Sequence, residues 1–532
     1  MAGLPFRTKA FYGLAGITMN LPDLIIMQWL LVRYVPPDKP HLVPAALFGG
    51  MILAARAIEA TGGTVIAHLS DVCQSRWGRR LPFMRFGLLP FALVFFLLFH
   101  PPLGHLHWIN AVYAMVLIPA YFLLYGTIVT PYLALMPEIT SDLKERVDLT
   151  TFQSVFILMG AFLFAGIGIM LDQWGWTVVI GGAALLIIVC FIPVSTQVRE
   201  KPRPQNHEQR LTLAQSLWLA LKNRPCRYVL AATSVYWFAL NAIIALVPYW
   251  VVNFLGRSEA DVTKLMALFL VVNLAFFFVF NALAARWGKY VLMLATFLGT
   301  GFVLMLLCLV GYLPFGSDFL QSAIVMAMFG APVAGFMVLP FAVLGDVVDY
   351  DQTLTGRRRE AIFFGVQGIF QKLMLGASVL TFTIVPYLGG DGTQRLREDG
   401  WLTFSVRYEA KSETPLPNPG DASQVSGGPA QALSVRIDPL PRGLDAPWTL
   451  RGPHGFEQEG HGATLLKNLE PGAYALTWHD VPGWASPEPQ RTPTPRGLKY
   501  MVALSALACL VSFAAFVKYP LRERDGKVVL VS

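Results

Sequence analysis

The chain has 532 residues, of which 55% are hydrophobic and only 14% are charged, and its mean hydropathy is +0.53. Soluble domains hold about half apolar and a quarter charged residues, so this composition excludes an ordinary soluble protein. The net charge of +8 is not accompanied by a basic domain or a nucleic-acid-binding motif. A lipid bilayer is therefore the expected partner, and nucleic acid is not.

Twelve apolar segments are long enough to cross about 30 Å of hydrocarbon as helices, the form in which lipid-exposed backbone satisfies its own hydrogen bonds. The first segment is longer than a signal peptide and has no small-residue cleavage site, so we interpret it as a span. The sequence thus predicts an all-α polytopic membrane protein. The segments are expected at about 10–34, 43–68, 82–101, 109–135, 149–172, 175–194, 227–254, 263–285, 290–313, 319–347, 361–387 and 498–518.

Basic residues lie in alternate loops. They cluster after the second, fourth, sixth, eighth and tenth segments, whereas the other short loops carry few. Because loops rich in Lys and Arg stay in the cytoplasm, both termini are expected to be cytoplasmic. The sequence has no Asn-x-Ser/Thr glycosylation site, which favours the inner membrane of a bacterium.

Two short motifs repeat along the chain: "SRWGRR" at 75–80 follows the second segment, and "ARWGKY" at 285–290 follows the eighth. Equivalent positions indicate two parallel six-helix repeats, the major facilitator architecture. The predicted parts are an N-terminal half (1–194), a cytoplasmic linker (195–226), helices 7–11 (227–390), an insertion (391–497), and helix 12 with the tail (498–532).

The glycines of these motifs suit tight turns, and the charged residues around them are predicted to form a cytoplasmic gate. The alternative is that they are ordinary basic turns. The predicted gate consists of Asp71, Arg76, Gly78, Arg79, Arg80, Glu138, Arg146, Arg286, Gly288, Asp346, Asp349 and Arg358.

Three stretches, "SDVCQSRWGRRLPF" (70–83), "PYLALMPEITSDLKERVDL" (131–149) and "LGDVVDYDQTLTGRRREAIFFGVQGIFQK" (344–372), closely resemble signatures of the glycoside–pentoside–hexuronide:cation symporters. The resemblance is to the melibiose-permease branch, and it implies transport of sugars with Na⁺, Li⁺ or H⁺. The same broad family contains Na⁺-dependent lysolipid transporters, so the substrate class stays open.

Three ionisable residues inside predicted spans are candidates for cation or proton coupling, because such residues are costly in lipid. Arg56 and Glu59 lie three residues apart on one helix face, and Lys372 lies in the eleventh segment. By resemblance, Glu59 matches the first cation-site carboxylate, Arg56 matches its neighbouring arginine, and Lys372 matches a nearby lysine. The second carboxylate of that site falls on Gly63. With one carboxylate left, we favour H⁺ over Na⁺. The alternatives are a structural ion pair, a snorkelling lysine and an uncoupled facilitator.

Aromatic and amide side chains are the candidate substrate-binding residues, because sugars present C–H faces to rings and hydroxyls to amides. By resemblance, a sugar-binding acid of the first helix falls on Asn20, and Asp23 one turn away can substitute for it. Many aromatic residues are alternatively lipid-facing. The predicted set is Asn20, Asp23, Tyr125, Tyr236, Trp237 and Asn241.

The insertion between helices 11 and 12, residues 391–497, is rich in Pro and Gly and shows strand-like alternation at 401–409, 432–438 and 472–480. It is predicted to be a small β-sandwich-like domain on the periplasmic side. Ligand capture, contact with an envelope partner and a simple spacer role all stay open.

The chain has no nucleophile motif, no phosphate-binding loop and no metal-ligand spacing, so neither an enzyme nor a cofactor is expected beyond a coupling ion, H⁺ or Na⁺. The leading hypothesis is a monomeric symporter of a sugar or glycoside that works by alternating access. A lysophospholipid or amphiphile transporter is the first alternative. The second is a membrane sensor or receptor that uses the outer β-domain.

Overall fold

The computed structural model describes residues 4–37, 41–73, 75–140, 143–197, 213–258, 260–314, 316–356, 359–387, 393–396, 401–407, 409–410, 434–440, 444–470, 472–479, 481, 484–485, 495–524 and 527–530. In this part of the chain, 12 helices are long and apolar enough to cross a membrane, as predicted.

The N-terminal half contains the first six spans. The first is continuous from α1 (Phe6–Ile25) through the π-helical segment η1 (Ile26–Leu30) to α2 (Leu31–Tyr34). The others are α3 (Ala45–Val72), α4 (Leu81–Leu98), α5 (Trp108–Ile139), α6 (Leu143–Ala165) and α7 (Ile167–Gln197). Inside α7 the helix breaks at Gly175, whose φ is 73°, and this break agrees with the boundary predicted between the fifth and sixth segments.

The C-terminal half begins after a short helix in the linker, α8 (Leu213–Lys222). Its first span is α9 (Arg224–Tyr249), which continues as the π-helical segment η2 (Trp250–Phe254). The remaining spans are α10 (Ala260–Trp287), α11 (Lys289–Cys308), α12 (Asp318–Thr355), α13 (Glu360–Phe382) with the 3-10 turn η3 (Val385–Tyr387), and α14 (Pro495–Val517). A hairpin of β10 (Leu521–Arg524) and β11 (Lys527–Leu530) follows α14.

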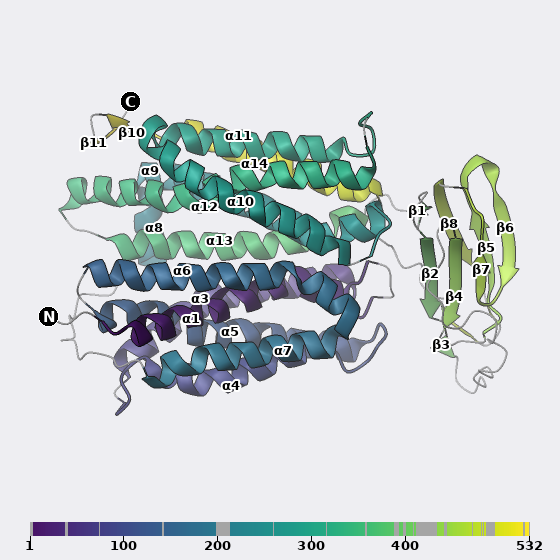
Figure 1. Ribbon diagram of the computed structural model, residues 1–532, viewed down its shortest axis with the longest axis horizontal. Helices are drawn as coiled ribbons and strands as arrows, with labels where there is room; N and C mark the ends of the chain where they lie inside the picture. Colours follow the sequence, from purple (N-terminus) through teal and green to yellow (C-terminus); the bar gives the residue numbers. More distant parts are fainter. Residues whose placement is uncertain are drawn as a thin grey trace.

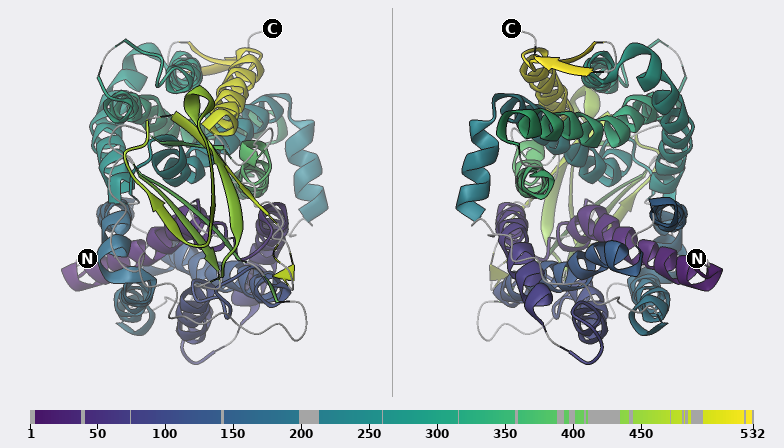
Figure 2. Two further views of the ribbon diagram at one scale, coloured as in Figure 1. Left: turned by 90° about the vertical axis from the view of Figure 1, so that its right-hand side faces the viewer. Right: turned by 90° about the vertical axis from the view of Figure 1, so that its left-hand side faces the viewer.

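The two halves lie side by side with their helices roughly parallel to one axis (Figure 1). Both chain ends lie at one end of the bundle, which we call the terminus end. The β-strands of the insertion lie beyond the opposite end, which we call the β-domain end (Figure 1; Figure 2). An even number of spans between the two termini explains why they share one end.

The insertion between α13 and α14 is a β-sandwich. Its larger sheets have the orders β1-β8-β5-β6 and β2-β4-β7, and β3 and β9 form a separate antiparallel pair. Side chains of both sheets form a common core: Val435 and Ile437 of β4 pack with Trp448 and Leu450 of β5 and with Tyr474 of β8. The strands are β1 (Thr393–Leu396), β2 (Trp401–Arg407), β3 (Glu409–Ala410), β4 (Ser434–Leu440), β5 (Pro447–Arg451), β6 (Glu457–His461), β7 (Thr464–Leu466), β8 (Gly472–Trp478) and β9 (Trp484–Ala485).

Candidate functional site

The second and eleventh spans, α3 and α13, pack together where the two halves meet. Gly376 makes this contact close, because a Cβ atom there would lie 2.8 Å from the Cα of Leu53 and 3.3 Å from the Cβ of Arg56. The glycine thus lets α13 approach α3 at the level of Arg56.

Four ionisable side chains meet near the middle of the spans, and we call them the four-charge cluster: Asp23 of α1, Arg56 and Glu59 of α3, and Lys372 of α13. Arg56 Nη1 donates to Glu59 Oε2 at 2.7 Å, and its Nη2 donates to Asp23 Oδ1 at 2.8 Å. Lys372 Nζ lies 3.0 Å from the other Glu59 oxygen, Oε1. The three predicted coupling residues are therefore in contact, whereas the pairing of Asp23 with Arg56 was not predicted.

The guanidinium of Arg56 is held by three helices of the N-terminal half. Its carbon lies 4.1 Å from the ring centroid of Phe122 on α5, and Nη2 also approaches Met27 Sδ at 3.1 Å. A cation over an aromatic face in a dry site is stabilised by the ring quadrupole. The side chain of Arg56 thus serves as a fixed positive charge against which both carboxylates are placed.

Exposure separates the cluster into a fixed and a displaceable part. Arg56 and Glu59 are each 2% exposed, but Lys372 is 33% exposed. Breaking a buried pair leaves an uncompensated buried charge, at a cost of about 3–5 kcal/mol, whereas water can solvate a lysine that is already partly exposed. Of the two basic partners of Glu59, Lys372 is therefore the one whose contact costs less to break.

One predicted substrate residue of the N-terminal half, Asp23, belongs to this cluster, and the other two are Asn20 and Tyr125. Asn20 Nδ2 donates to the carbonyl of Ile157 on α6 at 3.5 Å, and the hydroxyl of Tyr125 donates to the carbonyl of Met19 at 2.7 Å. Asp23 already accepts from Arg56. In this conformation Asp23 acts as a partner of Arg56, so one of its oxygens is occupied.

The predicted substrate residues of the C-terminal half divide into two groups. Tyr236 is fully buried, its hydroxyl is 2.6 Å from Thr300 Oγ1, and its ring centroid is 4.0 Å from that of Phe336. This places Tyr236 in the core of its own half. Trp237 instead packs edge-on against Phe336, and its indole N–H has no hydrogen-bond partner among the described residues; Asn241 Nδ2 donates to the Trp237 carbonyl at 2.9 Å.

Two polar residues that the sequence analysis did not single out also lie in these helices. The Gln367 side chain of α13 is 2% exposed and the Ser234 side chain of α9 is 5% exposed, and neither has a hydrogen-bond partner in the described part of the chain. The helices α9 and α13 pack together. In the sequence, the signal that could have pointed to Gln367 was a lone glutamine inside an apolar helix, as in "FGVQGIF". Unsatisfied buried donors and acceptors can bind a hydroxyl-bearing ligand.

The described members of the predicted gate lie at the terminus end. Gly78 and Gly288 have φ values of 111° and 77°, so both turns of the repeated motif need a glycine. Arg76 and Arg286 are exposed, and Arg76 stacks on Trp77 at 4.5 Å; Arg79, Arg80 and Asp349 lie in the same region. Arg358 and the side chains of Asp71, Glu138 and Arg146 lie outside what the structure describes.

Ion pairs described at the terminus end join residues of the same half. Lys289 Nζ contacts Asp346 Oδ1 at 2.6 Å, and Arg359 contacts Asp351 at 2.7 Å, both within the C-terminal half. These two pairs do not test the predicted cytoplasmic gate, which stays a prediction.

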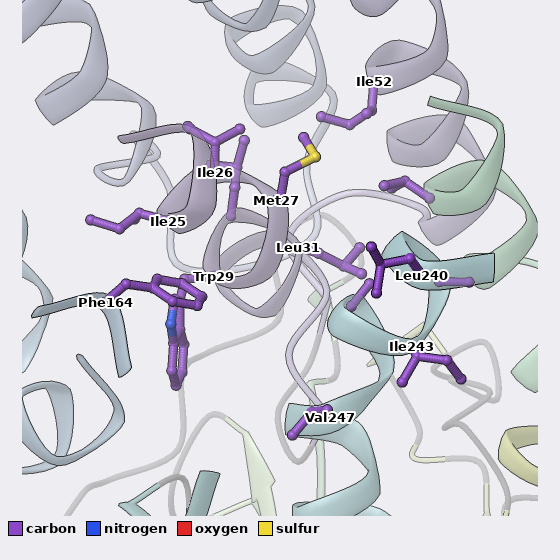
Figure 3. Close-up of a cluster of buried hydrophobic side chains, with 14 of the residues drawn as sticks. Ile25, Ile26, Met27, Trp29, Leu31, Ile52, Phe164, Leu240, Ile243 and Val247 are labelled. Atoms are coloured by element: carbon purple, nitrogen blue, oxygen red, sulfur yellow. The ribbon is translucent and has the colours of Figure 1, made fainter. Parts of the chain in front are cut away.

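Further hydrogen bonds join the halves at the β-domain end. Asn253 Nδ2 of η2 donates to the carbonyl of Pro37 at 2.9 Å, and the Tyr249 hydroxyl donates to the carbonyl of Val35. Closer to the middle of the bundle lies an apolar contact, in which Leu31 of the first span lies beside α9, while Met27 points toward Ile52 of α3 (Figure 3). The α9 side chains labelled there are Leu240, Ile243 and Val247. The bundle is thus closed at the β-domain end.

Comparison with known proteins gives a family match over most of the bundle. The family described as "MFS/sugar transport protein" matches residues 11–395. The chain is 25% identical to an isoprimeverose transporter of Lactiplantibacillus pentosus, over 73% of this chain and 81% of that protein. It is also 25% identical to the inner membrane symporter YicJ of Escherichia coli, over 76% of this chain and 87% of that protein.

Among solved structures, that of a D-xylose–proton symporter superposes with a TM-score of 0.53 and 15% identity, covering 72% of this chain and 91% of that chain. At this identity the likeness shows the fold alone. It confirms the two-half arrangement of twelve helices predicted from the repeated motifs.

Proposed function

Because the chain belongs to the family of MFS/sugar transport proteins, we propose that it carries a sugar or glycoside across the membrane together with a cation. It is an integral membrane transporter and not an enzyme, since its family and its fold are those of transporters. Alternating access then moves the binding site between the two membrane faces by rocking one half against the other.

The four-charge cluster is the observation that carries the proposed coupling. Glu59 lies at the interface of the halves, and its two oxygens contact charges from both: Arg56 from the N-terminal half and Lys372 from the C-terminal half. A cation that takes the place of Lys372 on Oε1 breaks the ionic link between α3 and α13. Binding of the cation therefore changes the energy of the contact that must open when the halves rock.

A proton is the cation that this cluster suits best. A proton needs one titratable oxygen, whereas hard metal cations take several oxygen ligands. Glu59 and Asp23 are the carboxylates of the cluster, and Asp23 already accepts from Arg56. Protonation of Glu59 removes the negative charge that holds Lys372, so H⁺ coupling requires no further ligand.

The substrate we propose is an uncharged sugar or glycoside. The charges of the cluster neutralise one another, so they leave no excess charge for an ionic ligand. Neutral groups lie on the facing helices instead: the Trp237 indole, the Gln367 amide and the Ser234 hydroxyl. Rings, amides and hydroxyls are the groups that bind sugars.

We further propose that the terminus end is cytoplasmic. Exposed or partly exposed basic side chains lie there in the last turn of α10 and after α3 and α12, among them Arg286, Arg76 and Arg359. The positive-inside rule then places the β-sandwich in the periplasm.

Counterflow in liposomes is the first test, because exchange of labelled for unlabelled substrate requires no assumption about the coupling ion. The panel contains neutral mono- and disaccharides, glucuronides and lysophospholipids. Counterflow of a neutral sugar supports the proposal. A signal from lysophospholipids alone would replace the proposed substrate class.

The coupling role is tested with Glu59→Gln. We expect this variant to retain counterflow and to lose accumulation against a gradient, because the amide neither binds a proton nor holds Lys372. The double variant Glu59→Gln, Lys372→Gln is the control, since it removes the unpaired lysine and tests whether a loss is caused by instability. Full accumulation by the single variant contradicts coupling through Glu59.

A further inference from the structure

The linker helix α8 differs from the spans in direction. It runs crosswise to them at the terminus end, on the flank of the bundle (Figure 1; Figure 2). One residue, Asn223, separates it from α9, and this residue caps α9 by accepting from the N–H of Cys226 at 3.2 Å. Because α9 enters the membrane at this point, α8 lies at the depth where a span begins.

Contacts with the bundle hold α8 in this position. It packs on α9 and α13, with Ala220 fully buried and Leu217 partly buried against the core. The corner after it is fastened by Asn223, whose Nδ2 donates to Asp351 Oδ1 at 3.4 Å, while Asp351 is paired with Arg359. The helix is therefore docked on its inner face.

The exposed surface of α8 also carries apolar side chains. Trp218 is 61% exposed and Leu221 is 41% exposed, three residues apart and hence on one side of the helix. Lys222 Nζ lies 4.9 Å from the Trp218 ring centroid, and Arg224 and Arg227 are exposed on the first turns of α9. Apolar side chains beside basic ones, on a helix in the plane of the membrane surface, match the composition of interfacial helices.

We propose that the outer face of α8 is a binding surface for anionic phospholipid, with Trp218 and Leu221 inserted at the level of the headgroups and Lys222 and Arg224 contacting the lipid phosphates. Tryptophan prefers this depth because its ring is apolar and its N–H is polar. The positive charge specifies the occupant, since basic residues near a membrane are attracted to anionic and not to zwitterionic lipid. This surface is independent of the transport site.

The first experiment measures the thermal stability of the full chain in nanodiscs of phosphatidylcholine with and without phosphatidylglycerol. We expect phosphatidylglycerol to raise the melting temperature of the wild type and to raise that of Lys222→Gln, Arg224→Gln by less than half as much. The matched control is Arg7→Gln, Lys518→Gln, which removes two exposed basic residues at the same end, one in α1 and one directly after α14. Equal losses in both double variants, or no effect of the lipid on the wild type, would overturn the proposal.

The second experiment locates the surface without relying on charge. An environment-sensitive fluorophore is attached to Trp218→Cys and, as control, to Leu354→Cys, a similarly exposed position, at 64%, near the end of α12. In liposomes that contain phosphatidylglycerol we expect blue-shifted emission at position 218 and water-like emission at position 354. Water-like emission at both positions overturns the proposal. A blue shift at position 218 that depends on the amount of protein per liposome, and not on the lipid, also overturns it, because it would indicate contact with a second copy of the chain.

Discussion

In the first span of the N-terminal half, Pro22 precedes a π-helical segment at Ile26–Leu30, and in the first span of the C-terminal half, Pro248 precedes one at Trp250–Phe254. Proline removes a backbone donor and crowds the preceding turn, which favours such irregular turns. Both segments lie at the β-domain end, and both take part in contacts between the halves. The first spans of the two halves thus share a proline followed by a π-helical segment where the halves meet.

The chemistry inside the two halves differs. The N-terminal half holds Asp23, Arg56 and Glu59 in direct contact, while α9 and α13 of the C-terminal half contribute neutral groups and Lys372. Backbone geometry is constrained in both halves by the same bilayer, whereas side chains facing the interface are not. Under the proposed function, Glu59 of α3 binds the cation, and α9 and α13 contribute neutral groups to the sugar site.

The largest effect is expected from Arg56→Gln. Removing this buried cation leaves Asp23 unpaired and Glu59 with only Lys372, so we expect the free energy of unfolding to fall by about 3–5 kcal/mol. Lys372→Gln should cost clearly less, because Lys372 is partly exposed and its loss leaves the Arg56–Glu59 pair intact. Thermal unfolding of both purified variants in one detergent measures the difference. Equal destabilisation would contradict the distinction between the fixed and the displaceable charge.

A gain of function is expected from Gly63→Asp. A Cβ atom at Gly63 meets nothing within 4 Å, so an aspartate has room one turn from Glu59. A second carboxylate supplies oxygen ligands that a metal cation needs, and we expect uptake to become dependent on Na⁺, with about tenfold stimulation. Gly63→Asn is the control of equal size. Stimulation of the wild type by Na⁺ would argue against proton coupling. Stimulation of the asparagine variant alone would argue against it too, because an effect of Na⁺ would then not depend on a second carboxylate.

The smallest effects are expected from substitutions of Tyr236 and Trp237, two neighbouring residues of α9. Tyr236→Phe removes the hydroxyl contact with Thr300 and should lower stability by about 1 kcal/mol while leaving the half-saturation concentration in counterflow unchanged. Trp237→Phe keeps a ring against Phe336 but loses the unpaired N–H, so it should raise that concentration about fivefold with little change in stability. If Tyr236→Phe instead raised the half-saturation concentration and Trp237→Phe left it unchanged, the result would show that Tyr236, and not Trp237, contacts the sugar.

Part of the candidate site could be predicted from the sequence. Arg56 and Glu59 lie three residues apart, and helical periodicity alone puts them on one face. The contact of Lys372 with Glu59 was predicted by resemblance to a family, not by spacing. Gln367 and Ser234 were missed because a single polar residue in an apolar helix has many uses, and only the surrounding packing shows that its hydrogen bonds are unsatisfied.

The sequence by itself determined the twelve spans, the two repeats and the β-rich insertion, because hydropathy, glycine turns and strand alternation are properties of short stretches of chain. Only the tertiary structure decided which helices are neighbours. It therefore decided that Asp23 pairs with Arg56, that Tyr236 packs in a core while Trp237 keeps an unpaired N–H, and that α8 has an exposed apolar face. Helical pitch defines the direction of a side chain on its own helix, but the partner it meets depends on how distant helices pack.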